Sequence, residues 1–218
     1  MIKNVIFDLD GTLIDTIEDI SIAINEALEE VGLSQRFDRV STCSLIGNGA
    51  DVLIRKALLD KGDDQVLFDR LKNAYMPRYK AYQNNHSVAF DGVDILLKDM
   101  RKEGMHAFVF TNKPDELARI ILSNTFGNAF EDILGQRGKE HLKPDPHFVL
   151  AMMEKHGMKK SDTIYVGDSI VDILTAHNAG LPVILVKWGY GTYDKETLAL
   201  ADFSVDCPEE IMGILQGY

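Results

Sequence analysis

The chain has 218 residues, of which 45% are hydrophobic and 26% are charged. This composition is typical of a globular protein that folds as one domain, or as one domain with an insert. The formal net charge of −11 argues against nucleic acid and against an anionic membrane as partners, because both are bound through basic surfaces.

The N-terminus and the cysteines favour a cytoplasmic protein. The first predicted strand begins within five residues of Met1, which leaves no room for a signal peptide. No apolar run approaches the roughly 20 residues that cross a bilayer. Cys43 and Cys207 lack the spacing of a metal site, and we expect both to pack as small apolar side chains in a reducing compartment.

The first part of the chain combines one strand with a long helical stretch. Residues 4–8 form a short β-branched and aromatic run that predicts a buried strand. From residue 16 to about residue 84 apolar residues recur at spacings of three and four, which predicts helices at 16–32, 50–60 and 64–82. Residues 84–86 resemble a linker back to the rest of the fold.

The remainder of the chain alternates strands with helices. Strands are predicted at 106–111, 163–167 and 183–186, with weaker ones at 133–134 and 201–205, and helices at 93–100, 115–124, 146–156, 170–179 and 208–216. This alternation indicates a parallel sheet covered on both faces. The predicted fold class is therefore α/β: a Rossmann-like doubly wound core of residues 1–15 and 85–218, with an inserted helical domain at 16–84, called the cap below.

Two carboxylates stand at the end of the first predicted strand. Asp8 and Asp10 are two residues apart, and Gly11 follows at once. Both can reach one cavity at the carboxyl edge of the sheet, where open α/β folds bind ligands. Two acids that close raise one another's pKa unless a cation lies between them. This segment predicts a metal site or an acid/base pair.

Three further segments place polar side chains at the ends of predicted strands or at helix starts. Thr111 and Asn112 end one strand, Asp168 ends another with Asp172 one helical turn later, and Lys143 precedes a proline and a helix. Asp8, Asp168 and Asp172 would supply oxygen ligands suited to Mg²⁺. The metal, Lys143 and donors around Thr111 could each neutralise a phosphoryl oxygen, as phosphoryl transfer requires.

These motifs resemble those of the haloacid dehalogenase-type (HAD) phosphohydrolase superfamily. The match covers four motifs in order over nearly the whole chain: Asp8-Leu9-Asp10-Gly11-Thr12, Thr111-Asn112, Lys143-Pro144, and Gly167-Asp168-Ser169 with Asp172. The resemblance implies that Asp8 attacks phosphorus and becomes an aspartyl phosphate. It also implies that Asp10 protonates the leaving alcohol and then takes a proton from the hydrolytic water.

The same resemblance implies how phosphate and metal are held. Thr111, Asn112 and Lys143 would bind the phosphoryl group. Mg²⁺ would be the cofactor, bound by the Asp8 carboxylate, the Asp10 main-chain carbonyl and Asp168, with Asp172 supporting these metal ligands.

Within the superfamily the sequence is most similar to phosphoglycolate phosphatases. The segment 45–53, which contains Gly47-Asn48-Gly49, looks like their cap signature. Glycines before a helix expose backbone N–H groups at its positive end, which suits a small carboxylate or phosphate, although a plain turn and helix start has the same pattern. We expect a small phosphorylated metabolite as substrate, with 2-phosphoglycolate favoured.

Other functions remain open at this stage. Inorganic pyrophosphatases and broad sugar-phosphate phosphatases share almost all of these motifs. A phosphomutase is disfavoured because such relatives usually carry a histidine about where Ile20 stands, and a non-catalytic phosphate-binding protein is disfavoured because every catalytic position is intact. We expect a monomer or small homo-oligomer, and hinges near residues 12–16 and 84–90. The aromatic segment 188–193 is predicted to pack on the core outside the site.

Overall fold

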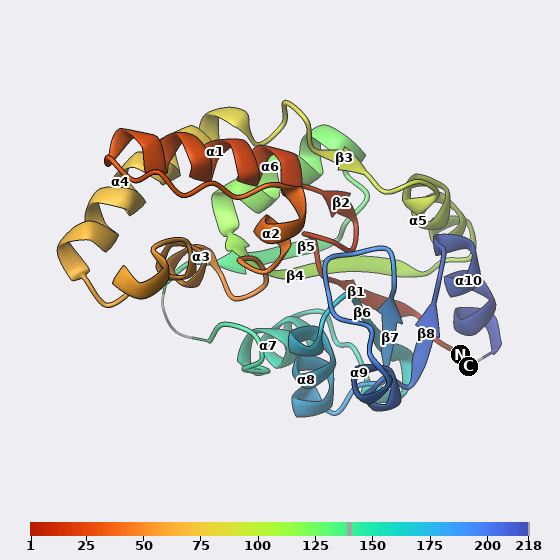
Figure 1. Ribbon diagram of the computed structural model, residues 1–218. Coiled ribbons are helices and arrows are strands. Elements are labelled where there is room, and N and C mark those ends of the chain that lie inside the picture. The colour runs from red at the N-terminus through yellow and green to blue at the C-terminus, as the bar shows by residue number, and fades with distance from the viewer. Residues whose placement is uncertain (139–140, 218) are drawn as a thin grey trace.

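The central element is a six-stranded parallel sheet, described in a computed structural model that covers residues 1–138 and 141–217 (Figure 1). The strand order is β5-β4-β1-β6-β7-β8. The strands are β1 (Asn4–Phe7), β4 (His106–Pro114), β5 (Asp132–Gln136), β6 (Thr163–Gly167), β7 (Val183–Val186) and β8 (Phe203–Val205). The weakly predicted strands at 133–134 and 201–205 are both present.

Helices cover both faces of the sheet. They are α5 (Val93–Lys102), α6 (Asp115–Phe126), α7 (His147–Lys155), α8 (Ile170–Ala179), α9 (Lys195–Leu200) and α10 (Pro208–Gly217). Side chains alternate along β1, so that Val5 and Phe7 pack with α5, α6 and α10, whereas Ile6 packs with α7 and α8. Because both faces are buried at the centre of the sheet, β1 and β7 are almost entirely apolar rather than alternating. The predicted doubly wound α/β fold is confirmed.

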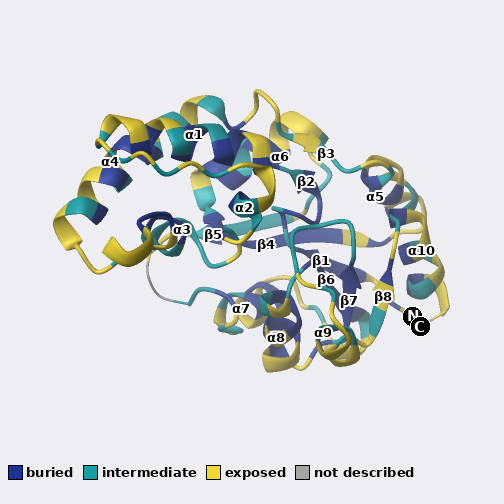
Figure 2. Cartoon of the chain, viewed as in Figure 1, coloured by how far each residue is buried: buried dark blue, intermediate teal, exposed yellow. Residues whose placement is uncertain are grey.

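The stretch between β1 and β4 is mainly helical and has its own apolar interior. It contains β2 (Ile14–Asp15), α1 (Ile17–Glu30), α2 (Arg39–Cys43), α3 (Ala50–Ala57), the 3-10 helix η1 (Leu59–Lys61), α4 (Gln65–Tyr82) and β3 (Val88–Ala89). Ile24 and Leu28 of α1 pack against Leu71 and Tyr75 of α4. Figure 2 shows buried stretches, in dark blue, along both helices. The domain boundaries given above stay a prediction.

Several short elements were not predicted. The helix expected over 50–60 ends at Ala57, where η1 follows, and α2 and α9 have only five and six residues. The two-residue strands β2 and β3 pair antiparallel, with Ile14 opposite Ala89. Such short elements carry too few residues for a periodic pattern, and long-range packing decides them.

The β2–β3 pair lies where the chain leaves the sheet and returns to it. The buried Asp19 carboxylate, in the first turn of α1, accepts hydrogen bonds from the amides of His86 and Ser87 and from the Ser87 hydroxyl. The two connections are therefore tied to each other at the positions predicted as hinges.

No helix in the described part of the chain is both long and apolar enough to span a membrane. Cys43 and Cys207 are free and partly buried, and Cys43 lies at the cavity described next.

Candidate active site

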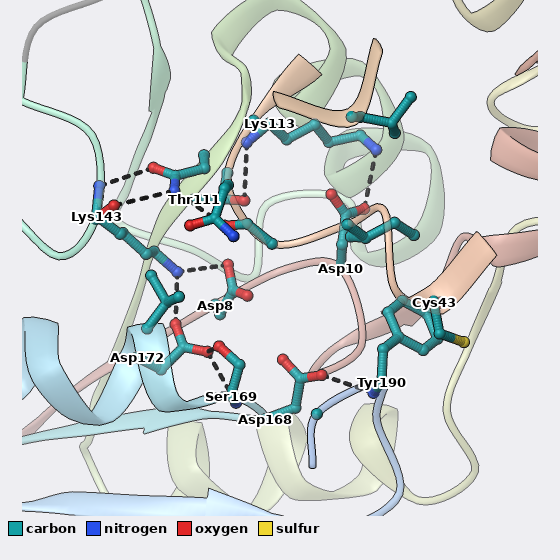
Figure 3. A pocket seen from close by; sticks show the side chains of 18 of the residues that line it. Asp8, Asp10, Cys43, Thr111, Lys113, Lys143, Asp168, Ser169, Asp172 and Tyr190 are labelled. Atoms are coloured by element: carbon teal, nitrogen blue, oxygen red, sulfur yellow. Dashed lines mark hydrogen bonds and ion pairs between the residues drawn. The ribbon is translucent and has the colours of Figure 1, made fainter. Parts of the chain in front are cut away.

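A cavity of about 320 Å³ lies at the carboxyl ends of β1, β4 and β6, below the cap helices (Figure 3). All the residues predicted for the site line it: Asp8, Asp10, Gly47, Asn48, Gly49, Thr111, Asn112, Lys143, Asp168 and Asp172. Parallel strands bring segments that are far apart in sequence to one edge of the sheet.

Three carboxylates converge on the core side of this cavity. Asp8 follows β1, Asp168 follows β6, and Asp172 lies in the first turn of α8. One oxygen from each lies within 4.8 Å of the others. Asp168 and Asp172 are only 3% and 1% exposed, so their charges are nearly removed from water. Buried like charges at this separation require compensation.

Lys143 supplies part of that compensation. Its Nζ lies 2.7 Å from Asp8 Oδ1 and 2.7 Å from Asp172 Oδ1. Burial alone would lower the pKa of Lys143, but the carboxylates of Asp172 and Asp8 outweigh burial and hold that pKa well above its usual value. The ammonium is therefore charged, and it neutralises one of three nearby negative charges.

The negative charge that Lys143 leaves uncompensated affects the pKa values of the carboxyl groups. Burial raises the pKa of Asp8 to about 7, against the lowering effect of Lys143 and with a further increase from Asp172. Burial, followed by the Asp172 and Asp8 charges, also raises the pKa of Asp168 well above its usual value. Without a further cation the cluster cannot carry all three negative charges at neutral pH.

The donor set fits a hard divalent cation. Asp8 Oδ1 is buried and makes no hydrogen bond within the described residues, although it faces Lys143. Asp172 is occupied differently: Oδ1 accepts from Lys143, and Oδ2 accepts from the Ser169 amide and hydroxyl at the start of α8. Asp168 accepts one hydrogen bond on each oxygen, from the Thr12 hydroxyl at 3.5 Å and the Tyr190 amide at 2.7 Å. Asp8 and Asp168 thus keep lone pairs that suit Mg²⁺, while Asp172 holds Lys143 in place.

Asp10 pairs with a different lysine from Asp8. Its Oδ1 accepts from Lys113 Nζ at 2.9 Å and from the Thr16 hydroxyl at 2.8 Å. The Lys113 side chain is 1% exposed, and its ammonium also contacts the hydroxyl of Tyr79 on α4. The sequence predicts no role for Lys113, although it directly follows Thr111 and Asn112.

Thr111 and Asn112 are buried at the end of β4. Thr111 Oγ1 accepts from the Lys113 amide, whereas Asn112 Oδ1 accepts from the Lys143 amide at 2.8 Å. Asn112 Nδ2 donates to the Gly47 carbonyl at 3.0 Å. The Asn112 side chain therefore positions Lys143 and joins the cap to the core, and its contact with a phosphoryl group stays a prediction.

The Gly47-Asn48-Gly49 segment faces the cavity from the cap. Gly47 and Gly49 have φ angles of 103° and 83°, which disfavour residues with a side chain. Gly49 is the residue before α3, and no side chain caps that helix start. Its first amides are thus not bonded by a capping side chain, as the predicted anion site requires.

The loop after β7 belongs to the site, which corrects the prediction for residues 188–193. Tyr190, Gly191 and Thr192 line the cavity, and the Tyr190 amide donates to Asp168 Oδ2 at 2.7 Å. A Cβ at Gly191 would lie 2.0 Å from the Asp168 carbonyl oxygen, so only glycine allows this approach. The two glycines that flank Tyr190 are the only signal in the sequence, and they also suit an ordinary loop.

The Tyr190 phenol links this loop to the root of the cap. Its oxygen accepts from the amides of Thr16 at 2.7 Å and Ile17 at 3.2 Å, and it donates to Asp15 Oδ1. Thr16 is the N-cap residue of α1, but its hydroxyl donates to Asp10 instead of capping the helix. Tyr190 therefore supplies an acceptor to the first amides at the start of α1, while the Thr16 side chain is engaged with Asp10.

Comparison with known proteins gives a consistent result. The model of the haloacid dehalogenase-like hydrolase family matches residues 5–186. The phosphoglycolate phosphatase of Pasteurella multocida is 32% identical over 218 residues, covering 96% of each chain. That of Cereibacter sphaeroides is 36% identical over 190 residues, covering 85% of each chain.

Solved structures agree with the sequence comparison. A crystal structure described as a predicted phosphoglycolate phosphatase from Haemophilus somnus superimposes with a TM-score of 0.89. The two chains are 30% identical, and the match covers 98% of this chain and 97% of the other.

Replacing Tyr190 with phenylalanine tests the link to the cap. Loss of the phenol leaves the Thr16 amide without its acceptor and the Ile17 amide with only Asp15 Oδ1 at 3.3 Å, so we expect the free energy of unfolding to fall by about 1–3 kcal/mol. Urea denaturation measures the change. Tyr82→Phe is the matched control, because its phenol bonds Glu26 on the cap surface, and we expect a loss under about 0.5 kcal/mol. Equal losses would contradict the assignment.

The buried charge predicts a pH dependence for the protein kept free of metal by a chelator. Burial raises the pKa of Asp8 from its ordinary value of 3.8 to about 7 in the folded state, so the folded state binds the proton more tightly. The contribution of this group to the free energy of unfolding therefore falls as the pH rises from about 4 to about 7. We expect the melting temperature of Asp8→Asn to exceed that of the wild type at pH 8, and we expect the difference to vanish toward pH 4. A variant less stable than the wild type at pH 8 would refute this.

Proposed function

The chain belongs to the haloacid dehalogenase-like hydrolase family and is a phosphoric monoester hydrolase, and we propose that it is a Mg²⁺-dependent phosphatase acting on 2-phosphoglycolate through an aspartyl phosphate on Asp8. The observation that carries this proposal is the buried excess of carboxylate beside Lys143. Three acids beside one lysine leave an excess of negative charge. The site is therefore stabilised most when a cation binds together with the phosphoryl group that it carries.

The reaction takes two steps on the residues described. A carboxylate oxygen of Asp8 bonds to phosphorus while the ester P–O bond breaks, and Asp10 gives its proton to the leaving oxygen. Asp10 then takes a proton from water, whose oxygen attacks the phosphorus and frees Asp8 and inorganic phosphate. Asp10 enters the first step protonated. Asp8 and Asp10 pair with different lysines, so the nucleophile and the proton-transfer group do not share one counter-ion.

Positive charge is the second requirement of phosphoryl transfer. Lys143 lies against Asp8 and can neutralise a phosphoryl oxygen, and the Thr111 hydroxyl at the end of β4 can hydrogen-bond another. Asp8, the Asp10 carbonyl and Asp168 would hold Mg²⁺, with Asp172 supporting them. The ion would supply further positive charge to the phosphoryl oxygens.

Two observations support a small carboxylated substrate, and two more disfavour a phosphomutase and a non-catalytic binder. The relatives named above are phosphoglycolate phosphatases, and the cavity is small. Ile20 lines the cavity where mutase relatives carry a histidine, so this position offers no proton-transfer group to a phosphomutase. Every proposed catalytic side chain faces the cavity, which disfavours a non-catalytic binder. Pyrophosphate and sugar phosphates remain the competing substrates.

The division of labour between core and cap is also proposed. Residues 16–84 would act as a cap that closes over the substrate, and the ties at residues 12–16 and 84–90 would be its hinges. Closure would exclude bulk water and leave one water for the second step. A cytoplasmic location and a monomer or small homo-oligomer stay predictions.

Phosphate release from a substrate panel tests the proposal. We expect turnover of 2-phosphoglycolate to exceed that of pyrophosphate, several sugar phosphates and nucleoside monophosphates, and to require Mg²⁺. Asp8→Asn should reduce kcat by several orders of magnitude because the nucleophile is lost. Asp60→Asn, an exposed carboxylate in η1, is the matched control and should retain activity.

Two results would refute parts of this proposal. Turnover by Asp8→Asn near that of the wild type would exclude Asp8 as nucleophile. A sugar phosphate converted to an isomer without release of inorganic phosphate would identify a phosphomutase instead.

A further inference from the structure

We propose that Lys113 determines specificity by binding a carboxylate on the carbon that carries the phosphate ester, so that the preferred substrates are 2-phosphooxy carboxylates. This inference rests on the proposed function, and it assigns the recognition of the leaving group to one side chain. The sequence motifs assign roles to Asp8, Asp10 and Lys143 but none to this lysine.

Lys113 is a buried cation with spare donor capacity. Its side chain is 1% exposed, and its Nζ contacts Asp10 Oδ1 and the Tyr79 hydroxyl. An ammonium has three N–H donors, and these two oxygens use two of them. Since Lys113 lines the cavity, the third is available to a ligand. A buried ammonium gains strongly from a second anionic partner.

The position of Lys113 beside Asp10 determines where an anionic group of the substrate must lie to contact the ammonium. Asp10 donates its proton to the bridging oxygen of the ester, so this oxygen lies against the Asp10 carboxyl during reaction. Lys113 Nζ is 2.9 Å from Asp10 Oδ1, so the ammonium adjoins the bridging oxygen as well. A carboxylate separated from the bridging oxygen by a single carbon can contact this ammonium. A carboxylate on a longer chain extends beyond it.

The other cations of the cavity are less suited to this role. Lys143 is committed to Asp8 and Asp172. The remaining lysine that lines the described cavity is Lys56, an exposed residue on α3 whose Nζ donates to the Ser44 carbonyl at 2.7 Å. An exposed ammonium is screened by water and gives little discrimination.

The cap side of the cavity excludes larger polar leaving groups. The rings of Tyr75 and Tyr79 stack with centroids 5.4 Å apart, and Ile20, Ile46 and Leu53 complete an apolar wall. Sugar hydroxyls placed against such a wall would lose hydrogen bonds to water without replacement. A short leaving group that ends at Lys113 avoids this cost.

The test compares two esters that differ mainly in charge: 2-phosphoglycolate and the phosphate ester of glycolamide. The ratio of their kcat/KM values is measured for the wild type, Lys113→Met and Lys56→Met. Methionine keeps the length and apolar stem of lysine without the charge. We expect Lys113→Met to reduce the preference for the carboxylate about 10- to 100-fold, the worth of a charged hydrogen bond, and Lys56→Met to leave the ratio unchanged.

Two outcomes would overturn the assignment while leaving the phosphatase intact. An equal loss on both esters in Lys113→Met would show that Lys113 only orients Asp10. Loss of the preference in Lys56→Met would place the carboxylate at the cavity mouth. Failure of the wild type to release phosphate from either ester would instead reject the proposed function.

A measurement on the wild type alone covers the case in which Lys113→Met does not fold. The phosphate ester of 3-hydroxypropionate carries its carboxylate one carbon farther from the bridging oxygen. We expect its kcat/KM to fall at least tenfold below that of 2-phosphoglycolate. Equal values for the two esters would overturn the placement of the carboxylate at Lys113.

Discussion

The burial of three carboxylates around one lysine is the constraint on which the rest of the site depends. Asp8, Asp168 and Asp172 meet at the edge of the sheet, and burial raises the pKa of Asp8 and Asp168. Such a cluster opposes folding at neutral pH until positive charge arrives. The surrounding fold must therefore hold the acids in place against their own repulsion, and much of the local architecture does this.

The neighbouring backbone holds the acids through close approach and hydrogen bonds. The loop after β7 passes so near Asp168 that a Cβ at Gly189 would lie 2.4 Å from the Asp168 Cβ atom. Asp172 accepts hydrogen bonds from the Ser169 amide and hydroxyl, and Ser169 is also the residue that caps the start of α8. Helix capping and carboxylate placement are thus served by the same bonds, so the site is as rigid as the sheet and helix that carry it.

Motifs at strand ends were predictable, and contacts across the fold were not. Asp8, Asp168 and Lys143 adjoin apolar runs or a proline, so local sequence indicated both their elements and their shared edge. The role of Tyr190 depends on the loop after β7 reaching the start of α1, a long-range contact that no local pattern encodes. Lys113 likewise has its partners on other segments, and its burial follows only from the cap packing over it.

The two key acids depend on different parts of the molecule. Asp8 is set by the core alone, through β1 and the Lys143–Asp172 pair. Asp10 is held by Thr16 at the root of the cap and by Lys113, whose ammonium contacts Tyr79 on α4. The surroundings of Asp10 thus include residues on both sides of the cavity, whereas the ion pair of Asp8 is made by a core residue and is linked to the cap through Asn112 and Gly47. In the proposed mechanism a moving cap would therefore act on the proton-transfer group through Tyr79 and Lys113, while the nucleophile keeps its direct partner Lys143.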